Sequence, residues 1–404
     1  MNIVIITDPQ RPDHYDYLIQ DNTHNYYFLW YEKKDDSNIH LNPINSELIY
    51  WQDYSTPQNL ITCIKPDRIV FFEIIDLRQI ALIISAKAAE INTYFLDHGA
   101  ANSKDTSISR YVETKFVQHK IPYLIKRFLG NFSNVLKAKY FYYSVITGFQ
   151  SSKSYLKYIT LPFLMLRAGP VEVLSTSLFK ERLPEYPLIF NRVNLDRYNL
   201  YTGATEKDVI LTGVPFFDSY FRNALVEEDY IVYIDHPYLE VGVAGWTADF
   251  HQKTANSLFE FAAKNKTKIY IKLHPLSDIN IWKNYSFNSN YIEILKKGDY
   301  TELYLKSKLI LGFSSSLITG FLCANKNVVL LGWNPVPGII GTDFSATGLC
   351  HVSNSTNDLD NKYHFWIENN CTYKEPEYSS FIKNYNYPFD GKATERIINL
   401  IAGV

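Results

Sequence analysis

Lys268-Ile-Tyr-Ile-Lys-Leu-His-Pro275 is a β-like run that ends in a histidine and a proline, and Leu309-Ile-Leu-Gly-Phe-Ser-Ser-Ser316 is a second run that ends in serines. Each run opens into a stretch that suits a helix. Parallel strands that lie side by side bring their carboxyl ends to one edge of the sheet, where open α/β sheets bind ligands. The two runs therefore predict an α/β fold with a ligand site at that edge.

The residues at the two run ends suit a phosphate group. Backbone N–H groups at a helix start bind phosphate oxygens, and an imidazole N–H donates a hydrogen bond whether the ring is neutral or charged. Pro275 biases His274 towards an extended backbone, which fixes where the ring leaves the strand. We expect His274, Pro275, Ser314, Ser315 and Ser316 to bind a nucleotide phosphate, with His274 stabilising the charge on the departing group. Capping of the following helix by the serines is compatible with this role.

Further candidates follow other β-like runs. Asp97 suits a general base for an acceptor hydroxyl, with His98 as the competing base, and Gly99 lets the backbone turn or approach a ligand closely. The alternative is a turn or cap aspartate with a hydrogen-bonded histidine. His236 belongs to a second His-Pro pair, which is either a ligand loop or a simple strand-to-loop turn. Asp8, after the first run, is a further candidate for lining the site.

The chain of 404 residues is long enough for two domains. β-like and helix-like segments alternate in both halves, which predicts parallel sheets covered on both faces. We expect two Rossmann-like domains that face a cleft, spanning 1–222 and 223–404, with a last helix over 393–402 that packs back on the first domain. In the first domain we expect strands at 3–6, 26–31, 68–72 and 93–96, a helix over 75–91, mostly helix over 108–170 and short strands over 171–213.

Composition narrows the class of protein. A formal net charge of −2 argues against a nucleic-acid partner. The four cysteines show neither metal-ligand spacing nor a disulfide framework, which favours a cytoplasmic protein. The N-terminus lacks the features of a signal peptide, and no apolar run reaches the roughly 20 residues that span a bilayer. Motifs for dinucleotides, Walker phosphate loops and zinc peptidases are missing, so we expect neither a cofactor nor a metal.

One stretch is strongly basic. Between Thr114 and Val171 there is no Asp or Glu, whereas lysines and arginines interleave with aromatic and aliphatic residues. This pattern suits contact with an anionic membrane surface, including the inner face of the cytoplasmic membrane, or with an anionic acceptor. The alternative is a buried helical pair whose lysines reach out to water.

Leu273-His274-Pro275 with Ser314-Ser315-Ser316 resembles the His-Pro and Ser motifs of bacterial GT-B glycosyltransferases that use CMP-activated sugars, namely sialyl-, polysialyl- and Kdo-transferases. The resemblance implies that the His and Ser residues bind the CMP phosphate. Leu96-Asp97-His98-Gly99 is similar to the acidic-acidic-Gly motif of that group but has His98 at the second acidic position. The resemblance therefore implies Asp97 as the base.

Two other stretches, Leu211–Asp218 and 298–316, resemble surface-polysaccharide transferases more generally, including teichoic-acid polymerases that use CDP-glycerol. Together the resemblances imply a metal-independent transferase that moves a sugar from a nucleotide donor to a capsule or lipooligosaccharide glycan, or to a lipid-linked acceptor. A CDP-polyol or UDP-sugar transferase, a nucleotide-sugar epimerase or hydrolase, and a non-catalytic nucleotide- or glycan-binding protein are the alternatives.

Overall fold

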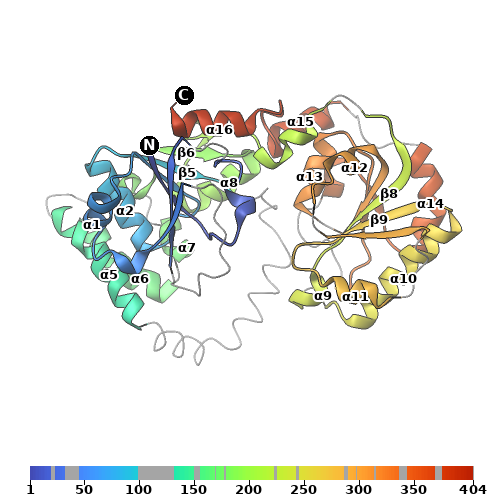
Figure 1. Ribbon diagram of the computed structural model, residues 1–404, viewed down its shortest axis with the longest axis horizontal. Coiled ribbons are helices and arrows are strands. Elements are labelled where there is room, and N and C mark those ends of the chain that lie inside the picture. Colours follow the sequence, from blue (N-terminus) through green and yellow to red (C-terminus); the bar gives the residue numbers. More distant parts are fainter. Residues whose placement is uncertain are drawn as a thin grey trace. The chain divides into compact units, whose positions relative to one another are not determined.

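The computed structural model describes residues 1–19, 23–31, 45–98, 132–149, 155–168, 170–176, 179–222, 225–242, 245–285, 290–296, 298–313, 315–335, 344–368 and 375–403. The chain divides into two compact units (Figure 1). Unit 1 holds the described residues up to Pro215 together with those of Lys392–Val404, and unit 2 holds Phe216–Gly391. The chain therefore leaves unit 1, builds unit 2 and returns.

Unit 1 contains a seven-stranded parallel sheet with the strand order β3-β2-β1-β4-β5-β6-β7. The strands are β1 (Asn2–Ile6), β2 (Asn25–Trp30), β3 (Ser46–Tyr50), β4 (Arg68–Phe71), β5 (Asn92–Leu96), β6 (Tyr186–Ile189) and β7 (Ile210–Leu211). Central strands such as Ile-Val-Ile-Ile in β1 are apolar at every position because both faces of the sheet are covered.

Helices cover the two faces of this sheet. They are α1 (Pro57–Ile64), α2 (Leu77–Ala88), α5 (Phe132–Ile146), α6 (Tyr155–Ala168), α7 (Pro170–Thr176), α8 (Arg192–Thr202) and α16 (Ala393–Ala402). On one face, Val4 and Ile6 of β1 pack in a core with the buried side of α2 and with Phe141 of α5. Asp76 starts α2 with a capping box, in which its side chain and that of Gln79 satisfy backbone N–H groups at the helix start.

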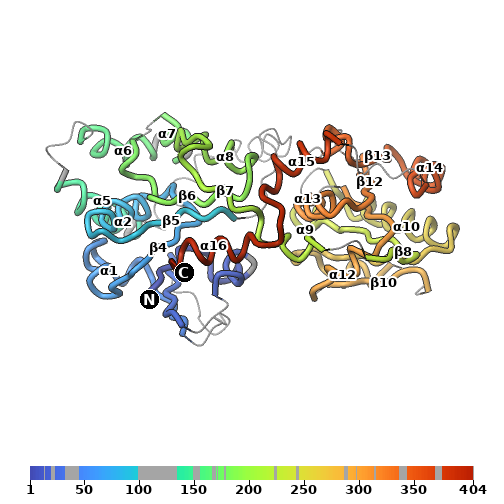
Figure 2. Tube along the Cα trace, turned by 90° about the horizontal axis from the view of Figure 1, so that it is seen from above, coloured from blue at the N-terminus to red at the C-terminus, as the bar shows by residue number. Residues whose placement is uncertain are grey.

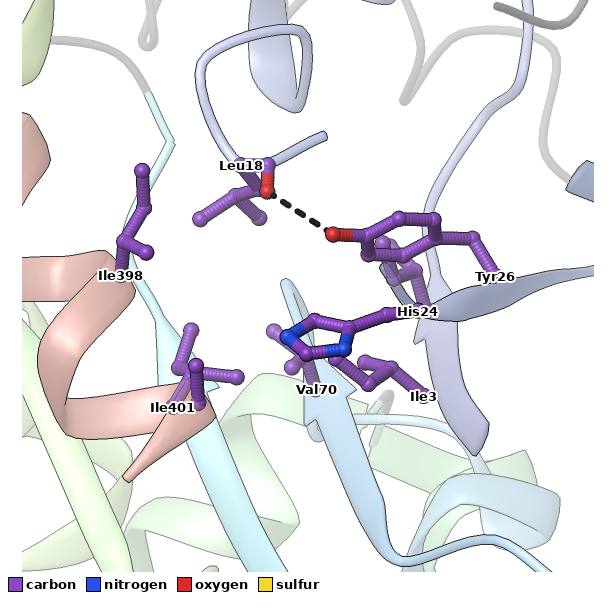
Figure 3. A pocket seen from close by; sticks show the side chains of 9 residues that line it. Ile3, Leu18, His24, Tyr26, Val70, Ile398 and Ile401 are labelled. Carbon is purple, nitrogen blue, oxygen red and sulfur yellow. Dashed lines mark hydrogen bonds between the residues drawn. The ribbon is translucent and has the colours of Figure 1, made fainter. Parts of the chain in front are cut away.

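The last helix, α16, belongs to unit 1 although it follows unit 2 in the sequence. Ile3 and Ile5, which alternate with the core residues of β1, line a small cavity of about 30 Å³ with Ile398 and Ile401 of α16 (Figure 3). Ile397 and Ile401 are buried, and Arg396 donates a hydrogen bond from Nη1 to the carbonyl oxygen of Thr212. The two chain ends consequently lie close together (Figure 2).

Unit 2 contains a six-stranded parallel sheet with the order β10-β9-β8-β11-β12-β13. Its strands are β8 (Glu228–Ile234), β9 (Lys268–Lys272), β10 (Ile292–Leu295), β11 (Ser307–Gly312), β12 (Val328–Leu331) and β13 (His351–Ser353). Its helices are α9 (Tyr238–Val241), α10 (Ala248–Lys264), α11 (Ile279–Lys283), α12 (Thr301–Lys306), α13 (Ser316–Cys323), α14 (Thr356–Glu368) and α15 (Glu377–Tyr385).

The expected α/β fold with two parallel-sheet, Rossmann-like units is confirmed. The expectation of short strands throughout 171–213 is wrong, because α7 and α8 occupy much of this stretch and, among its described residues, only β6 and β7 are strands. Strand β3 and helix α1 add to the expected elements of the first half. Most of the basic stretch before α5 lies outside the described residues.

Candidate functional site

Strand register places the predicted phosphate-binding residues of unit 2 at one level. Lys272 of β9 pairs with Ile234 of β8, and Ile234 pairs with Gly312 of β11. His274 and His236 each stand two residues beyond this row, at the carboxyl edge of neighbouring strands. The loop that carries Ser315, which we call the serine loop, leaves β11 after Gly312 at the same level. Three adjacent loops therefore present two histidines and a helix start along one edge of the sheet.

His274 is held by the loop that follows it. The backbone N–H of Leu276 donates to His274 Nδ1 at 3.1 Å, so Nδ1 carries a lone pair and the neutral ring holds its proton on Nε2. Ser277 closes the same turn by donating from its backbone N–H to the His274 carbonyl oxygen at 3.0 Å. This tautomer leaves an N–H on the ring edge opposite the backbone, which is the form needed to donate to a phosphate oxygen.

His236 lies beside His274, with ring centroids 6.3 Å apart and nearly perpendicular planes. Its Nδ1 is 3.1 Å from the carbonyl oxygen of Asp235, and burial lowers the pKa of the ring to about 4. The carboxyl of Asp235 is buried and accepts a hydrogen bond from Ser277 Oγ at 2.7 Å. Burial raises the pKa of Asp235 to about 7. Asp235 and Ser277 thus tie together the two loops that carry the histidines.

The serine loop provides the third group. Ser315 is the N-cap of α13, and its Oγ accepts a hydrogen bond from the Leu317 backbone N–H at 3.3 Å. Ser316 is exposed and is the first residue of the helix, while Ser314 lies outside the described residues. Pro275 is exposed in the adjacent loop. Ser315 therefore caps a helix, which is the expected local role and one that leaves the helix start available to an anion.

Unit 1 shows the same arrangement with carboxylates. Ile6 of β1 pairs with Phe71 of β4, and Phe71 pairs with Phe95 of β5. The residues two positions beyond this row are Asp8, Glu73 and Asp97. Burial raises the pKa of Glu73, and the Arg197 charge partly opposes that shift. At these positions unit 1 therefore has three carboxyl groups, whereas unit 2 has histidines at two of the corresponding positions.

Asp97 is buried and already hydrogen-bonded. Its Oδ2 accepts a hydrogen bond from Asn194 Nδ2, and its Oδ1 accepts one from the His98 backbone N–H at 3.0 Å. Burial raises the pKa of Asp97 to about 6, while these hydrogen bonds, the backbone of Phe190 and the Arg197 charge oppose the shift. Asp97 thus connects the end of β5 to helix α8 through the buried Asn194.

His98 instead lines a cavity of about 110 Å³ at this edge. The cavity wall also contains Asp8, Glu73 and His14, and the His14 and His98 ring centroids are 5.1 Å apart. Burial lowers the pKa of His98 to about 4, and the neighbouring charges of His14 and Arg197 act in the same direction. The buried His98 Nδ1 has no hydrogen-bond partner among the described residues. The His98 ring is therefore neutral near pH 7 and faces a cavity that Asp97 does not line.

The sequence-predicted residues form two groups, one in each unit. In unit 2 the structure brings His236 and His274 together, with Ser315 and Ser316 on the next strand along. In unit 1 it brings Asp8 and His98 to one cavity, places Asp97 behind it, and leaves Gly99 outside the described residues. Several residues at these two edges were not predicted from the sequence, and a position at a strand end could have identified only Glu73 and Asp235. The missed residues are His14, Glu73, Asn194, Asp235 and Ser277.

The described residues contain no group of three or more histidine, cysteine or acidic side chains placed to hold a metal ion. Within the same residues, every helix is too short or too polar to cross a membrane.

The sequence matches no protein-family model and no curated protein. Among solved structures, the wall teichoic acid polymerase TagF aligns over 100% of this chain and 88% of its own, with 11% identity and a TM-score of 0.55. A histidine-to-asparagine variant of TagF soaked with CDPG gives 12% identity over the same shares of the two chains and a TM-score of 0.51. UDP-GlcNAc 2-epimerase from Methanocaldococcus jannaschii also aligns over 100% of both chains with 12% identity, but its TM-score of 0.49 adds nothing to the fold assignment. At these identities the similarity to TagF establishes a shared fold: this chain has the two-unit α/β architecture of the GT-B proteins.

Proposed function

We propose that the protein is a transferase of surface-polymer synthesis that takes its donor from a nucleotide and binds the donor phosphates at the carboxyl edge of unit 2. The observation that carries this proposal is the row of His274, His236 and the start of α13 on three adjacent strands. N–H groups and a helix N-terminus are anion ligands. The CDPG-soaked structure of TagF, which shares this fold, supports a nucleotide donor of this kind.

The width of the row favours a diphosphate. Neighbouring strands lie roughly 4.8 Å apart, so the loops after β9 and β11 are separated by about twice that distance. A single phosphate is too small to contact all three loops. In a nucleoside diphosphate, each of the two phosphates can contact different loops, so that together they reach all three. A CDP-polyol or UDP-sugar donor is therefore the first candidate. A CMP-linked sialic acid or Kdo donor is the second, and the resemblance at Leu273-His274-Pro275 and the serines favours it.

Unit 1 supplies the base in this proposal. His98 is neutral, lines a cavity and takes the proton of an acceptor hydroxyl as the acceptor oxygen bonds to the transferred group. The bond to the leaving phosphate breaks in the same step, and His274 and the start of α13 stabilise the charge on that phosphate. Asp97 has the role of positioning the backbone of His98 and α8 through its hydrogen bonds. The acceptor is a cell-surface glycan or a lipid-linked precursor.

A nucleotide screen tests the donor site. Because a ligand that binds only the folded state raises its stability, CDP or UDP should increase the melting temperature more than CMP does. His274→Ala should remove this increase, whereas Lys253→Ala, on the exposed side of α10, should retain it. A larger increase with CMP would favour the CMP-sugar donor, and no response to any nucleotide would contradict the proposal.

Turnover assays separate the remaining functions. A transferase consumes the nucleotide donor only when an acceptor is present, whereas an epimerase or hydrolase converts the nucleotide sugar alone. A protein that binds nucleotide but does neither is a binding protein. The assay should therefore compare donor consumption with and without a polysaccharide or lipid-linked acceptor fraction.

A further inference from the structure

Exposed apolar side chains are concentrated on two helices of unit 1. Of the thirteen large hydrophobic residues that are exposed in the described part of the chain, five lie on α5 and α6, which contain 15 and 14 residues. They are Leu136, Tyr140, Leu156, Phe163 and Leu164, with exposed fractions from 43% to 72%. We call these five side chains, with the lysines of the two helices, the α5–α6 face. A cluster of exposed apolar side chains normally marks a site that binds another protein, a membrane or a ligand.

The exposed side chains of the α5–α6 face form rows along both helices. Leu136 and Tyr140 are one helical turn apart, as are Leu156 and Thr160, and Phe163 continues the second row. Lys139 Nζ lies 5.4 Å from the centre of the Phe163 ring, which joins the exposed sides of the two helices.

On the opposite side, the two helices are fixed to each other and to the core. Tyr142 and Tyr143 of α5 donate hydrogen bonds to the carbonyl oxygens of Tyr158 and Ile159 of α6, at 2.9 and 3.0 Å. The aromatic residues Phe141 and Tyr158 are buried in the core of unit 1. The outward residues are therefore held in place on a rigid pair of helices.

The charge of the face selects its partner. Lys137, Lys139 and Lys157 lie on these helices, and the sequence has no carboxylate from Thr114 to Val171, although the whole chain has a net charge of −2. One carboxylate, that of Asp53, lines a hollow together with Leu136, Lys137 and Tyr140, so three lysines face a single anion beside these helices. A surface that combines exposed leucine, phenylalanine and tyrosine with an excess of cations matches the boundary of an anionic bilayer. There the apolar groups enter the acyl region, the tyrosine stays at the interface and the lysines meet lipid headgroups.

We propose that the α5–α6 face docks this protein on the surface of an anionic lipid bilayer. The proposal is independent of the nucleotide site, because the face belongs to unit 1 and the donor row to unit 2. Docking would bring the transferase to lipid-linked or membrane-bound acceptors. A second copy of the chain is the competing occupant, and it would cover the apolar residues without requiring anionic lipid.

Vesicle flotation tests the proposal with the purified full chain. We expect the protein to float with vesicles of equal parts phosphatidylcholine and phosphatidylglycerol, and not with phosphatidylcholine alone. Leu156→Glu combined with Phe163→Glu should weaken binding at least roughly tenfold, because both apolar contacts become charged. Each lysine replaced by alanine at Lys137 or Lys157 should weaken it roughly fivefold, and added salt should weaken it further.

The matched control is Leu200→Glu, which places the same charge on another exposed leucine of unit 1, on α8. It should bind vesicles as the unmodified protein does, and all variants should keep the thermal response to nucleotide. Equal loss in the control, equal binding to neutral vesicles or no binding at all would overturn the proposal. So would light scattering that shows an oligomer dissociating in the double variant without any change in vesicle binding, since the face would then join two protein chains.

Discussion

Asp235 is the residue on which the geometry of both His-Pro loops depends. It precedes His236, and its carboxyl accepts the Ser277 hydroxyl of the loop that carries His274. Because burial raises its pKa to about 7, Asp235 gains or loses its proton near neutral pH. The ionised form strengthens the hydrogen bond from Ser277 but remains inside an apolar environment.

This burial predicts a pH dependence of stability. In the unfolded chain Asp235 ionises near its ordinary pKa of 3.8, and in the folded chain only near 7. Between these values the folded state binds more protons, so this group makes the free energy of unfolding fall as pH rises. Asp235→Asn should therefore gain stability relative to the unmodified protein from pH 4 to 7, by on the order of a few kcal/mol at most. Chemical denaturation at several pH values measures this difference, and a constant difference would contradict it.

Whether His98 or Asp97 is the base determines the pH at which kcat/KM falls on the acid side of its pH profile. A base must be deprotonated, and burial places the pKa of His98 at about 4 and that of Asp97 at about 6. With His98 as the base, kcat/KM should stay constant as the pH falls through 6 and decline only near 4. Asp97→Asn should lower the rate less than His98→Ala does. A limb near pH 6, or a greater loss in Asp97→Asn, would identify Asp97 as the base.

At the residue scale, the sequence predicted side chains that follow recognisable strands and missed those brought in by tertiary packing. His274 and His236 each follow an apolar run and precede a proline, so both were recognisable. Asn194 lies on a polar helix almost a hundred residues after Asp97, and only the folded sheet brings the two into contact. Ser277 is equally inconspicuous in a loop until its partner Asp235 is known.

Among the elements, helix α13 packs closely against the ring of Phe217, and this contact requires a glycine at position 320. A Cβ added at Gly320 would lie 2.6 Å from the ring of Phe217, which is itself buried. Alanine normally stabilises a helix interior by roughly 1 kcal/mol relative to glycine. Here the buried ring cannot move aside freely, so Gly320→Ala should lower the free energy of unfolding by about 1–3 kcal/mol.

Gly148 provides the control for this substitution, because nothing lies within 4 Å of a Cβ added there. Gly148→Ala should change stability by less than about 0.5 kcal/mol. Denaturant unfolding of both variants measures the difference. Equal effects of the two substitutions would show that Phe217 is not tightly packed against α13.

Elements were predictable where apolar residues form an uninterrupted run or a clear helical period. The helix at Ala393–Ala402 matches its expected bounds, and β5 begins one residue before the strand expected at 93–96, because each has a compact apolar pattern. Helix α8 was missed because its buried side includes Asn194 and Thr202 beside Leu195 and Tyr198, which weakens the apolar period. Its start depends on Asn191, whose side chain accepts a hydrogen bond from the Asn194 backbone N–H.

For the whole molecule, the division into two units predicts that a substitution in α16 lowers the stability of unit 1, although unit 2 lies between α16 and the rest of unit 1 in the sequence. Ile397 is fully buried, and α16 packs against strands of unit 1. Ile397→Ala should destabilise unit 1 by about 2–5 kcal/mol while unit 2 keeps its stability. Calorimetry with and without nucleotide measures this, because bound nucleotide shifts the transition of unit 2 and so identifies it. A loss of stability confined to unit 2 would contradict the assignment of α16.

The return of the chain from unit 2 to unit 1 also sets the order in which the protein can be completed on the ribosome. Domains generally fold as units while the chain emerges from its N-terminal end. The described residues of unit 2 lie in the stretch Phe216–Gly391, all of which leaves the exit tunnel before α16 does. Unit 1 is synthesised first but must wait, with the surface under α16 uncovered, until the helix at Ala393–Ala402 emerges. Throughout that interval the nascent chain presents the Ile3 and Ile5 face of its sheet to chaperones, and the half that is translated first is the half that matures last.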